Sequence, residues 1–261
     1  MNALAARRRH PAAIAILLLL GLVAVGGAYS LLAPKQAQAS VVSAGDINTG
    51  KSLFLANCAT CHGMNAQGSA AGPTLVGVGA ASVDFQVGTG RMPLAAPNVQ
   101  AQRQDTSQFT QEQIANMAAW VASLAPGPAI PGAQYTSGQN ADVAQGGEIF
   151  RINCAQCHNY AGSGGALSRG KYAPSLTGSS GKTIYEAMLT GPQSMPVFSD
   201  SNISAQNKNN IIAYLKTTQT EQQVGGMTLG NLGPVSEGMF IWIFGLGLML
   251  GCAFWLGQKA A

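Results

Sequence analysis

One six-residue pattern occurs twice in this chain, and the residues around it recur with it. Asn-Cys-Ala-Thr-Cys-His occupies 57–62 and Asn-Cys-Ala-Gln-Cys-His occupies 153–158, an offset of 96 residues. Further matches keep the same order in both halves: Gly50 and Phe54 with Gly146 and Phe150, Pro73 with Pro174, Met92 with Met195, and Trp120 with Tyr214. Such self-similarity indicates two copies of one folding unit.

Pro- and Gly-rich segments separate the copies, because neither residue continues a helix well. Segment 126–140 lies between the copies, and segment 225–237 follows the second one. We therefore predict two domains, residues 41–125 and 141–224. The linker between them is short, so the folded domains are expected to remain neighbours.

Within each copy the sequence favours helices. The conserved spacing of four residues between the glycine and the phenylalanine places both on one helix face. Residues 111–124 and 206–218 contain good helix formers and neither Pro nor Gly. Little in either copy alternates with a period of two. We therefore predict an all-α fold.

The Cys-x-x-Cys-His pattern predicts covalent haem attachment. Cys58 and Cys61 stand nearly one above the other on a helical turn, which suits thioether bonds to the two vinyl groups of one haem. His62 follows directly, so its imidazole can ligate the iron from the same side. The second copy repeats the arrangement with Cys154, Cys157 and His158. We expect two covalently bound haem c groups.

Other interpretations of the paired cysteines fit less well. A Cys₄ zinc site would need the two pairs to meet, although each pair lies in its own repeat with its own histidine. A thioredoxin-like redox motif needs a βαβ context, which the sequence does not show. The fifth cysteine, Cys252, lies in an apolar run and is interpreted as a small apolar residue.

The second iron ligand is expected to be a methionine. Met92 and Met195 share a Met-Pro context and follow glycine-containing loops that could cross the open face of a haem. Met117 and Met188 lie in helical patterns and are expected in the core, and Met64 is too close to its histidine. His/Met ligation raises the haem potential, which suits an electron carrier on the oxidising side of a chain.

Charge patterning argues against nucleic-acid binding. The net charge is +4, but four of the 14 basic residues lie at the extreme ends of the chain. Residues 34–234 carry 10 Lys and Arg against 9 Asp and Glu. No basic stripe remains that could follow a phosphate backbone.

Both ends of the chain have the pattern of membrane-spanning helices. Residues 12–33 and 238–258 are uncharged and long enough to cross roughly 30 Å of hydrocarbon. Three arginines precede the first segment, so termini 1–11 and 259–261 are predicted in the cytoplasm. The intervening chain, beginning with linker 34–40, is then predicted on the outer face, with membrane lipid around both helices.

A cleaved signal peptide is the competing interpretation of the first segment. Ala37-Gln38-Ala39 resembles a small-residue cleavage site. The apolar stretch before it is longer than the usual signal core of about 7–15 residues. A retained anchor is therefore favoured.

Each repeat resembles a class I cytochrome c. In that family the first helix carries a Gly-x-x-x-Phe face that crosses the last helix beside an aromatic residue. The resemblance implies that Gly50 and Phe54 meet Trp120, with the matching set in the second copy. The loops at Pro73 and Pro174 resemble the segment whose proline backbone supports the histidine ligand.

The whole chain resembles the dihaem cytochrome c subunit of the actinobacterial menaquinol–cytochrome c reductase, the cytochrome bcc complex. The resemblance rests on one helix before and one after two fused cytochrome domains, and on Arg91-Met92-Pro93 followed by a long insertion. It implies a cytochrome b subunit and a Rieske iron–sulfur subunit as partners. It further implies electron flow from the Rieske centre to the haem at His62, then to the haem at His158, then to an aa₃-type oxidase.

Three other assignments remain open. The dihaem subunit of a cbb₃-type oxidase carries its anchoring helices before the haem domains, whereas segment 238–258 follows them. A dihaem peroxidase needs an iron with an open or displaceable ligand, and two Met-Pro candidates argue against one. A cytochrome subunit of a periplasmic dehydrogenase is not separated by the sequence. No nucleophile triad, phosphate loop or carboxylate pair is visible, so substrate turnover is expected of the complex and not of this chain alone.

Overall fold

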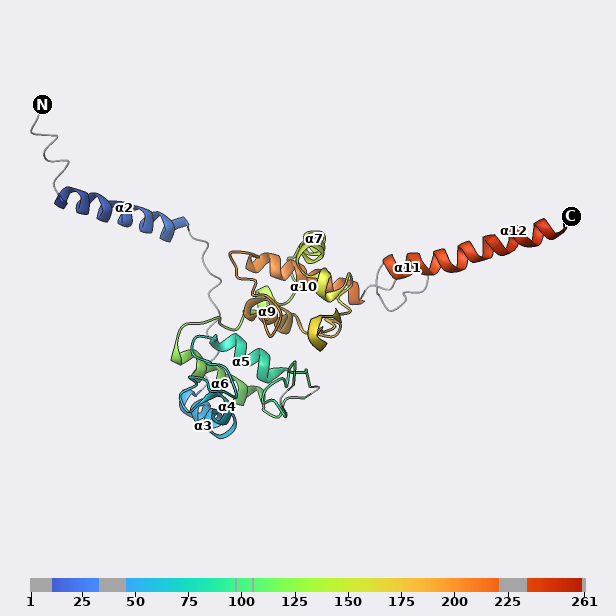
Figure 1. Ribbon diagram of the computed structural model, residues 1–261. Helices are drawn as coiled ribbons and strands as arrows, with labels where there is room; N and C mark the ends of the chain where they lie inside the picture. The colour runs from blue at the N-terminus through green and yellow to red at the C-terminus, as the bar shows by residue number, and fades with distance from the viewer. Residues whose placement is uncertain (1–10, 33–45, 97, 105, 221–233, 260–261) are drawn as a thin grey trace, which may run out of the picture. The chain divides into compact units, whose positions relative to one another are not determined.

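The structure is a computed structural model, and it divides the chain into two units, residues 1–38 and 39–261. Figure 1 shows the path of the chain. The described residues are 11–32, 46–96, 98–104, 106–220 and 234–259. Four predictions lie wholly or mostly outside them: the N-terminal segment 1–11, linker 34–40 with its Ala-Gln-Ala site, linker 225–237 and the C-terminal segment 259–261.

The first unit contains one described helix, α2 (Pro11–Leu32). Its large apolar side chains are exposed along its length, and residues 12–29 are long and apolar enough to cross a membrane. The helix begins within one residue of the predicted segment 12–33.

The second apolar helix is built from three successive pieces. They are α11 (Pro234–Ile241), the π-helical stretch η4 (Trp242–Leu246) and α12 (Gly247–Lys259). Together they begin four residues before the predicted segment 238–258, because proline is well tolerated in the first turn of a helix. Residues 235–258 satisfy the length and apolar composition of a membrane span.

The first domain is helical, as predicted. Its helices are α3 (Ile47–Asn57), α4 (Ala59–His62), α5 (Gly79–Gly88) and α6 (Gln111–Leu124). The last coincides with the predicted helix 111–124. It begins with a capping box, in which the Thr110 hydroxyl accepts from Gln113 N and the Gln113 side chain accepts from Thr110 N.

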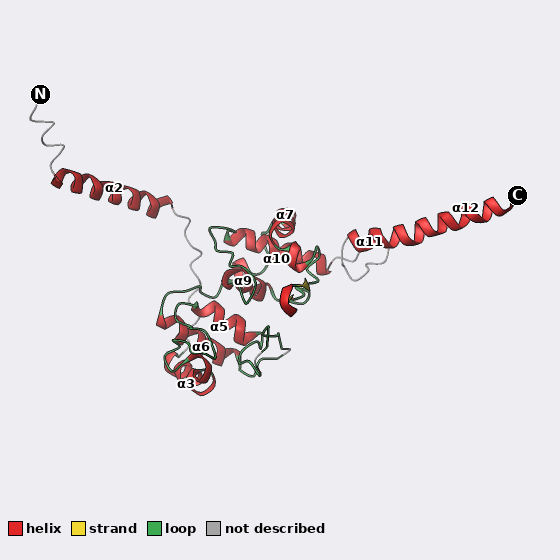
Figure 2. Ribbon diagram, in the orientation of Figure 1, coloured by secondary structure: helices red, strands yellow, loops and turns green. Residues whose placement is uncertain are grey.

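The second domain repeats this order with small additions. The short helix η1 (Ala133–Tyr135) lies in the linker before it. The helices of the domain itself are α7 (Val143–Asn153), α8 (Ala155–His158), η2 (Ser168–Gly170), α9 (Gly181–Thr190) and α10 (Ala205–Thr220). Strands β1 (Gly165–Ala166) and β2 (Tyr172–Ala173) form one short antiparallel ladder around η2. Figure 2 shows helix and loop through almost all of both domains, so the all-α prediction is confirmed apart from this hairpin.

Each domain is organised by one close helix crossing. A Cβ atom added to Gly50 on α3 would overlap the backbone carbonyl of Asn116 on α6, and one added to Gly146 on α7 would overlap that of Asn210 on α10. Only glycine permits backbones to approach this closely. The aromatic pairs predicted beside the crossings are present, with ring centroids 4.3 Å apart for Phe54–Trp120 and 5.5 Å apart for Phe150–Tyr214.

An asparagine on the last helix fastens the start of the first helix in both domains. The Asn116 side chain accepts from Asp46 N at 2.9 Å, and the Asn210 side chain accepts from Asp142 N at 3.0 Å. Asp46 and Asp142 are in turn the N-caps of α3 and α7. The start of each domain is therefore held at the same crossing that its glycine permits.

The linker 126–140 is ordered and packs on both domains. Pro128 O accepts from Ala81 N at 3.1 Å, and Ile130 is buried in the first core. Farther along, Gly138 N donates to Asn209 Oδ1 at 2.9 Å. The domains are therefore joined by packed chain, and the expectation that they remain neighbours is confirmed by the contacts between them.

A charged cluster joins α5 of the first domain to α9 of the second. Lys182 Nζ lies 2.5 Å from Asp84 Oδ2 and 4.0 Å from Glu186 Oε1. Glu186 is 2% exposed, and burial, with Asp84 as a further cause, raises its pKa to about 10. Lys182 opposes this rise weakly because Asp84 is its closer partner, so Glu186 is protonated at neutral pH.

The Gly50→Ala substitution should lower the free energy of unfolding by about 1–3 kcal/mol, because the new methyl group forces α3 away from α6. Gly88→Ala is the matched control. Gly88 is helical, lies in the same domain and has open space around it, so alanine there should be neutral or stabilising by under about 1 kcal/mol. Denaturant unfolding of both variants checks this, and equal effects would contradict the crossing.

The Glu186→Gln substitution should make stability less sensitive to pH. The folded pKa of Glu186 lies above its unfolded value, so its contribution is complete below the unfolded pKa of about 4.5 and declines as pH rises toward about 10. The variant should therefore gain stability over the wild type by on the order of 1 kcal/mol for each pH unit between pH 6 and 9. Thermal unfolding across this range tests it, with the exposed Glu148→Gln as control; parallel curves for all three proteins would refute it.

Candidate haem sites

A cavity of about 300 Å³ lies in the first domain beside the first Cys-x-x-Cys-His motif. Cys58, His62 and Met92 all line it, together with apolar side chains of α3, α5 and α6. Cys61 is exposed and is not among the lining residues. Three of the four predicted site residues of this domain therefore meet at one cavity, and the fourth lies one helical turn along the motif.

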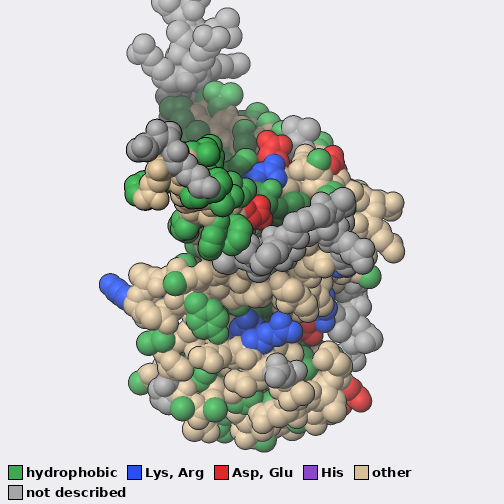
Figure 3. Space-filling model, turned by 90° about the vertical axis from the view of Figure 1, so that its right-hand side faces the viewer, with side chains coloured by type: hydrophobic (Ala, Val, Ile, Leu, Met, Phe, Trp, Pro, Cys, Tyr) green, Lys and Arg blue, Asp and Glu red, His purple; other side chains and the backbone are tan. Residues whose placement is uncertain are grey.

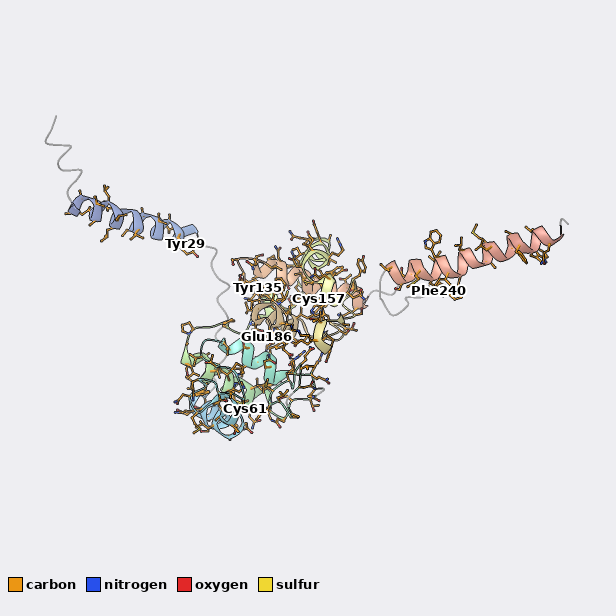
Figure 4. All side chains as sticks on the ribbon, in the orientation of Figure 1. Tyr29, Cys61, Tyr135, Cys157, Glu186 and Phe240 are labelled. Carbon is orange, nitrogen blue, oxygen red and sulfur yellow. The ribbon has the colours of Figure 1, made fainter. Side chains whose placement is uncertain are left out.

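The second domain holds a cavity of about 390 Å³ in the corresponding place. All four predicted residues line it, namely Cys154, Cys157, His158 and Met195. Figure 4 marks Cys61 in the first domain and Cys157 in the second. Because the two cysteine pairs belong to different domains and cavities, the structure does not assemble a Cys₄ zinc site.

A single helical turn positions each cysteine pair and histidine. His62 N donates to Cys58 O at 3.0 Å, and His158 N donates to Cys154 O at 2.9 Å. The turn then ends at a residue with positive φ, Gly63 in one domain and Asn159 in the other. This abrupt end turns the chain away and leaves the histidine at the edge of the cavity.

A backbone carbonyl orients each histidine ring. His62 Nδ1 lies 2.7 Å from Pro73 O, and His158 Nδ1 lies 3.0 Å from Pro174 O. A carbonyl oxygen only accepts, so Nδ1 carries the proton and Nε2 keeps its lone pair for a metal. The role expected of the two proline loops is confirmed.

The inner thiols are in their neutral form. Burial raises the pKa of Cys58 and of Cys154 to about 11, and the neighbouring thiol of each pair adds to the rise. Burial also lowers the pKa of His158, which the hydrogen bond to Pro174 partly opposes. Neutral imidazole is the form that binds iron.

The methionines divide as their sequence context predicted, with one addition. Met92 and Met195 lie on loops that reach the cavities, whereas Met64 is 62% exposed and lines neither. Met117 and Met188 are buried core residues, as expected, and also contribute to the cavity walls. Each cavity therefore offers one loop methionine and one helix methionine.

The lining residues fit a haem in both cavities. A haem is a flat, largely apolar ring with two carboxylates on the edge opposite its vinyl groups. Apolar side chains such as Phe54 and Val87 dominate the first cavity, and Phe150, Ile184 and Leu215 do so in the second. Gln86 lines the first cavity with its Oε1 buried and without a hydrogen-bond partner, so its amide can reorient toward a bound polar group.

The two cavities share a wall, which sequence reasoning missed. Pro192 and Gln193 line both of them. The side chain of Gln193 is held by two hydrogen bonds to the backbone of Ala101 in the first domain, at 2.8 and 3.1 Å. The signal in the sequence was the long insertion after Met92, whose residues cross to the second domain.

Two family models match the chain, one in each domain. Residues 47–125 match the family described as cytochrome c. Residues 141–215 match the family described as cytochrome c oxidase, cbb₃-type, subunit III. The second match covers a single cytochrome domain and does not extend to either terminal helix.

Relatives match over nearly the whole chain. A protein of Corynebacterium diphtheriae is 42% identical across 97% of this chain and 95% of its own length. Proteins of Mycobacterium leprae and Mycobacterium tuberculosis are 44% identical across 94% of this chain and 87% and 90% of theirs. All three are named cytochrome bc1 complex cytochrome c subunit. This full-length agreement disfavours the cbb₃-type alternative.

Proposed function

The chain belongs to the family of cytochrome bc1 complex cytochrome c subunits, and from this premise we propose how its residues relay electrons. It is the cytochrome c subunit of a quinol–cytochrome c reductase, and its two cytochrome c domains carry two covalently bound haem c groups. The relay enters at the first domain and leaves from the second. The observation that carries transfer between the two domains is the wall that the two cavities share. The order of the two haems is what the family resemblance implies.

We propose that Cys58, Cys61, Cys154 and Cys157 hold the haems through thioether bonds. His62 and Met92 ligate the first iron, and His158 and Met195 ligate the second. The motif geometry, the oriented Nε2 atoms and the reach of the two loops support this set. Met117 and Met188 lie in the packed helices α6 and α9, so the loop methionines are better placed to complete the coordination after the haem is bound.

Each haem supplies, when bound, an iron that alternates between the ferric and ferrous states. The residues around each haem hold it in place for electron transfer, and none of them is proposed to convert a substrate. Apolar side chains form much of the wall of both cavities, and the carbonyl groups of Pro73 and Pro174 hold the histidine rings in one orientation. The ordered linker and the contacts across the domain interface keep the two sites together, so an electron passes within one chain without diffusion of a separate carrier.

We propose specific partners for the two ends of the relay. The Rieske iron–sulfur subunit, held beside the cytochrome b subunit, donates to the first domain. The second domain donates to an aa₃-type oxidase in place of a soluble cytochrome c. The names of the relatives call them subunits of a cytochrome bc1 complex, which supports assembly of this chain with other subunits.

We propose that both apolar helices are retained as anchors in the cell membrane, with both termini in the cytoplasm and residues 40–234 on the outer face. The arginines before α2 and Lys259 at the end of α12 support this orientation. Reporter fusions at residues 3 and 261 should both report the cytoplasm. A mature protein that begins at Ser40 would instead show that the first helix is removed and that a single anchor remains.

The Met92→Ala substitution should lower the potential of one haem by on the order of 0.1 V and leave the other near its original value, because axial ligands set haem potentials over roughly 0.8 V. Redox titration of purified protein with two haems confirmed by intact mass measures this. Met64→Ala is the matched control, since Met64 lines neither cavity. If Met92→Ala changes neither potential while Met64→Ala or Met117→Ala shifts one, the ligand assignment is wrong.

Met195→Ala tests the direction of the relay in the assembled complex. The substitution should drop the potential of the second haem, so quinol still reduces the haem at His62 quickly while oxygen consumption falls at least tenfold. Stopped-flow spectra and an oxygen electrode record the two steps separately. Loss of rapid reduction at His62 in this variant would reverse the proposed order.

A further inference from the structure

The cavity of the second domain is partly walled by the first domain. Four residues of the first domain line the second cavity. Phe85 lies in α5, Arg91 lies between α5 and Met92, and the insertion after Met92 contributes Gln100 and Arg103. Arg91 and Arg103 are the only Lys or Arg residues among its lining residues. The cations at the second haem site are therefore supplied by the neighbouring domain.

Both arginines are held in place by neighbours. Arg91 Nη1 donates to Thr89 Oγ1 at 2.6 Å, and its guanidinium lies over the Phe85 ring, 4.8 Å from the centroid. Arg103 Nη1 donates across the interface to Ser179 Oγ at 3.3 Å. Nearby, Gln100 pairs with the backbone of Tyr172 through two hydrogen bonds of 2.9 Å each. The insertion is thus seated on the second domain beside its cavity.

The lining of the second cavity contains no carboxylate to match these charges. Neither Asp nor Glu is among its lining residues. The ion pairs found among the described residues use Lys182 and Lys208, and neither arginine takes part in one. Each guanidinium has five N–H donors, of which the hydrogen bonds above use one. Arg91 is partly buried, whereas Arg103 is exposed, and the pKa of Arg91 is lowered by its burial and by the neighbouring charge of Arg103. An anion in the cavity beside both guanidinium groups would offset this repulsion.

The haem expected in this cavity brings such an anion. We propose that Arg91 and Arg103 of the first domain bind the propionate carboxylates of the haem held by the second domain. Planar guanidinium groups match carboxylates with paired N–H donors, and Arg91 enters from the residue next to Met92. One loop therefore serves both sites, with its methionine at one cavity and its arginine at the other.

This arrangement makes the two haems electrostatically unequal. The first cavity is lined by no Lys, Arg, Asp or Glu. The position in the second repeat that corresponds to Arg91 is Ser194. The second domain therefore supplies no cation to the first cavity from this position. Positive charge stabilises the reduced state of a haem, and the second haem is therefore the better electron acceptor. The gradient runs from the first domain to the second, in the direction of the proposed relay.

The test is redox titration of each haem in the full-length protein with Arg103→Gln, Arg103→Lys and Arg91→Gln. In each glutamine variant, the ratio of oxidised to reduced second haem at a fixed solution potential should rise about tenfold. This corresponds to a haem potential about 59 mV lower for a one-electron couple. Arg103→Lys keeps the positive charge, so the potential of the second haem should stay close to its wild-type value. Arg169→Gln is the matched control, because Arg169 is an exposed arginine of the second domain that does not line the cavity.

A second measurement separates propionate binding from simple support of the interface. Without its guanidinium partner a propionate has a higher pKa, so the potential of the second haem should fall with rising pH between about 5 and 8 in the glutamine variants and stay flat in the wild type. Unchanged potentials and pH profiles, or shifts confined to the first haem, would overturn the proposal. The inference rests on the proposed haem sites. Failure of those sites would be recognised separately, because the intact mass of the wild type would then show fewer than two haems.

Discussion

The close approach of first and last helices at a glycine is the constraint on which both domains depend. Gly50 and Gly146 each lie against a backbone carbonyl, and no side chain larger than hydrogen fits there. The crossing brings an aromatic pair together and lets an asparagine fasten the start of the first helix. The helical turn that carries the cysteines and the histidine directly follows the first helix of this crossing. The cavity lies between that turn and the other helices of the domain.

The contact between the domains turns two such cavities into a relay. It combines a buried carboxylic acid at Glu186, an ion pair between Lys182 and Asp84, and side-chain amides that pair with backbone across the interface. Surface ion pairs alone would contribute little. The hydrogen bonds of the insertion, together with the packed linker, give a defined separation of the cavities and a common wall at Pro192 and Gln193.

Helix 111–124 was predicted from the residue pattern alone, because helix formers without Pro or Gly act locally, and it is present. The histidine-supporting prolines and the paired aromatic residues were expected from the resemblance to class I cytochromes c, and they are also present. Met64 was excluded by its distance from the opposite haem face, and it lies exposed outside both cavities. The hairpin of β1 and β2 was not anticipated, because two-residue strands leave no alternating pattern to detect.

The sequence by itself determined the two repeats, the haem attachment motifs, the helical class and the apolar ends, since each depends on residues close together along the chain. Only the tertiary structure decided that Arg91 and Arg103 of one domain line the cavity of the other, and that both cavities share Pro192 and Gln193. These relations join residues 70 or more positions apart, as the hydrogen bonds from Gln100 to Tyr172 and from Gln193 to Ala101 show. No local periodicity encodes such a distance, because the docking of two folded surfaces depends on shape and hydrogen-bond geometry that exist only after folding.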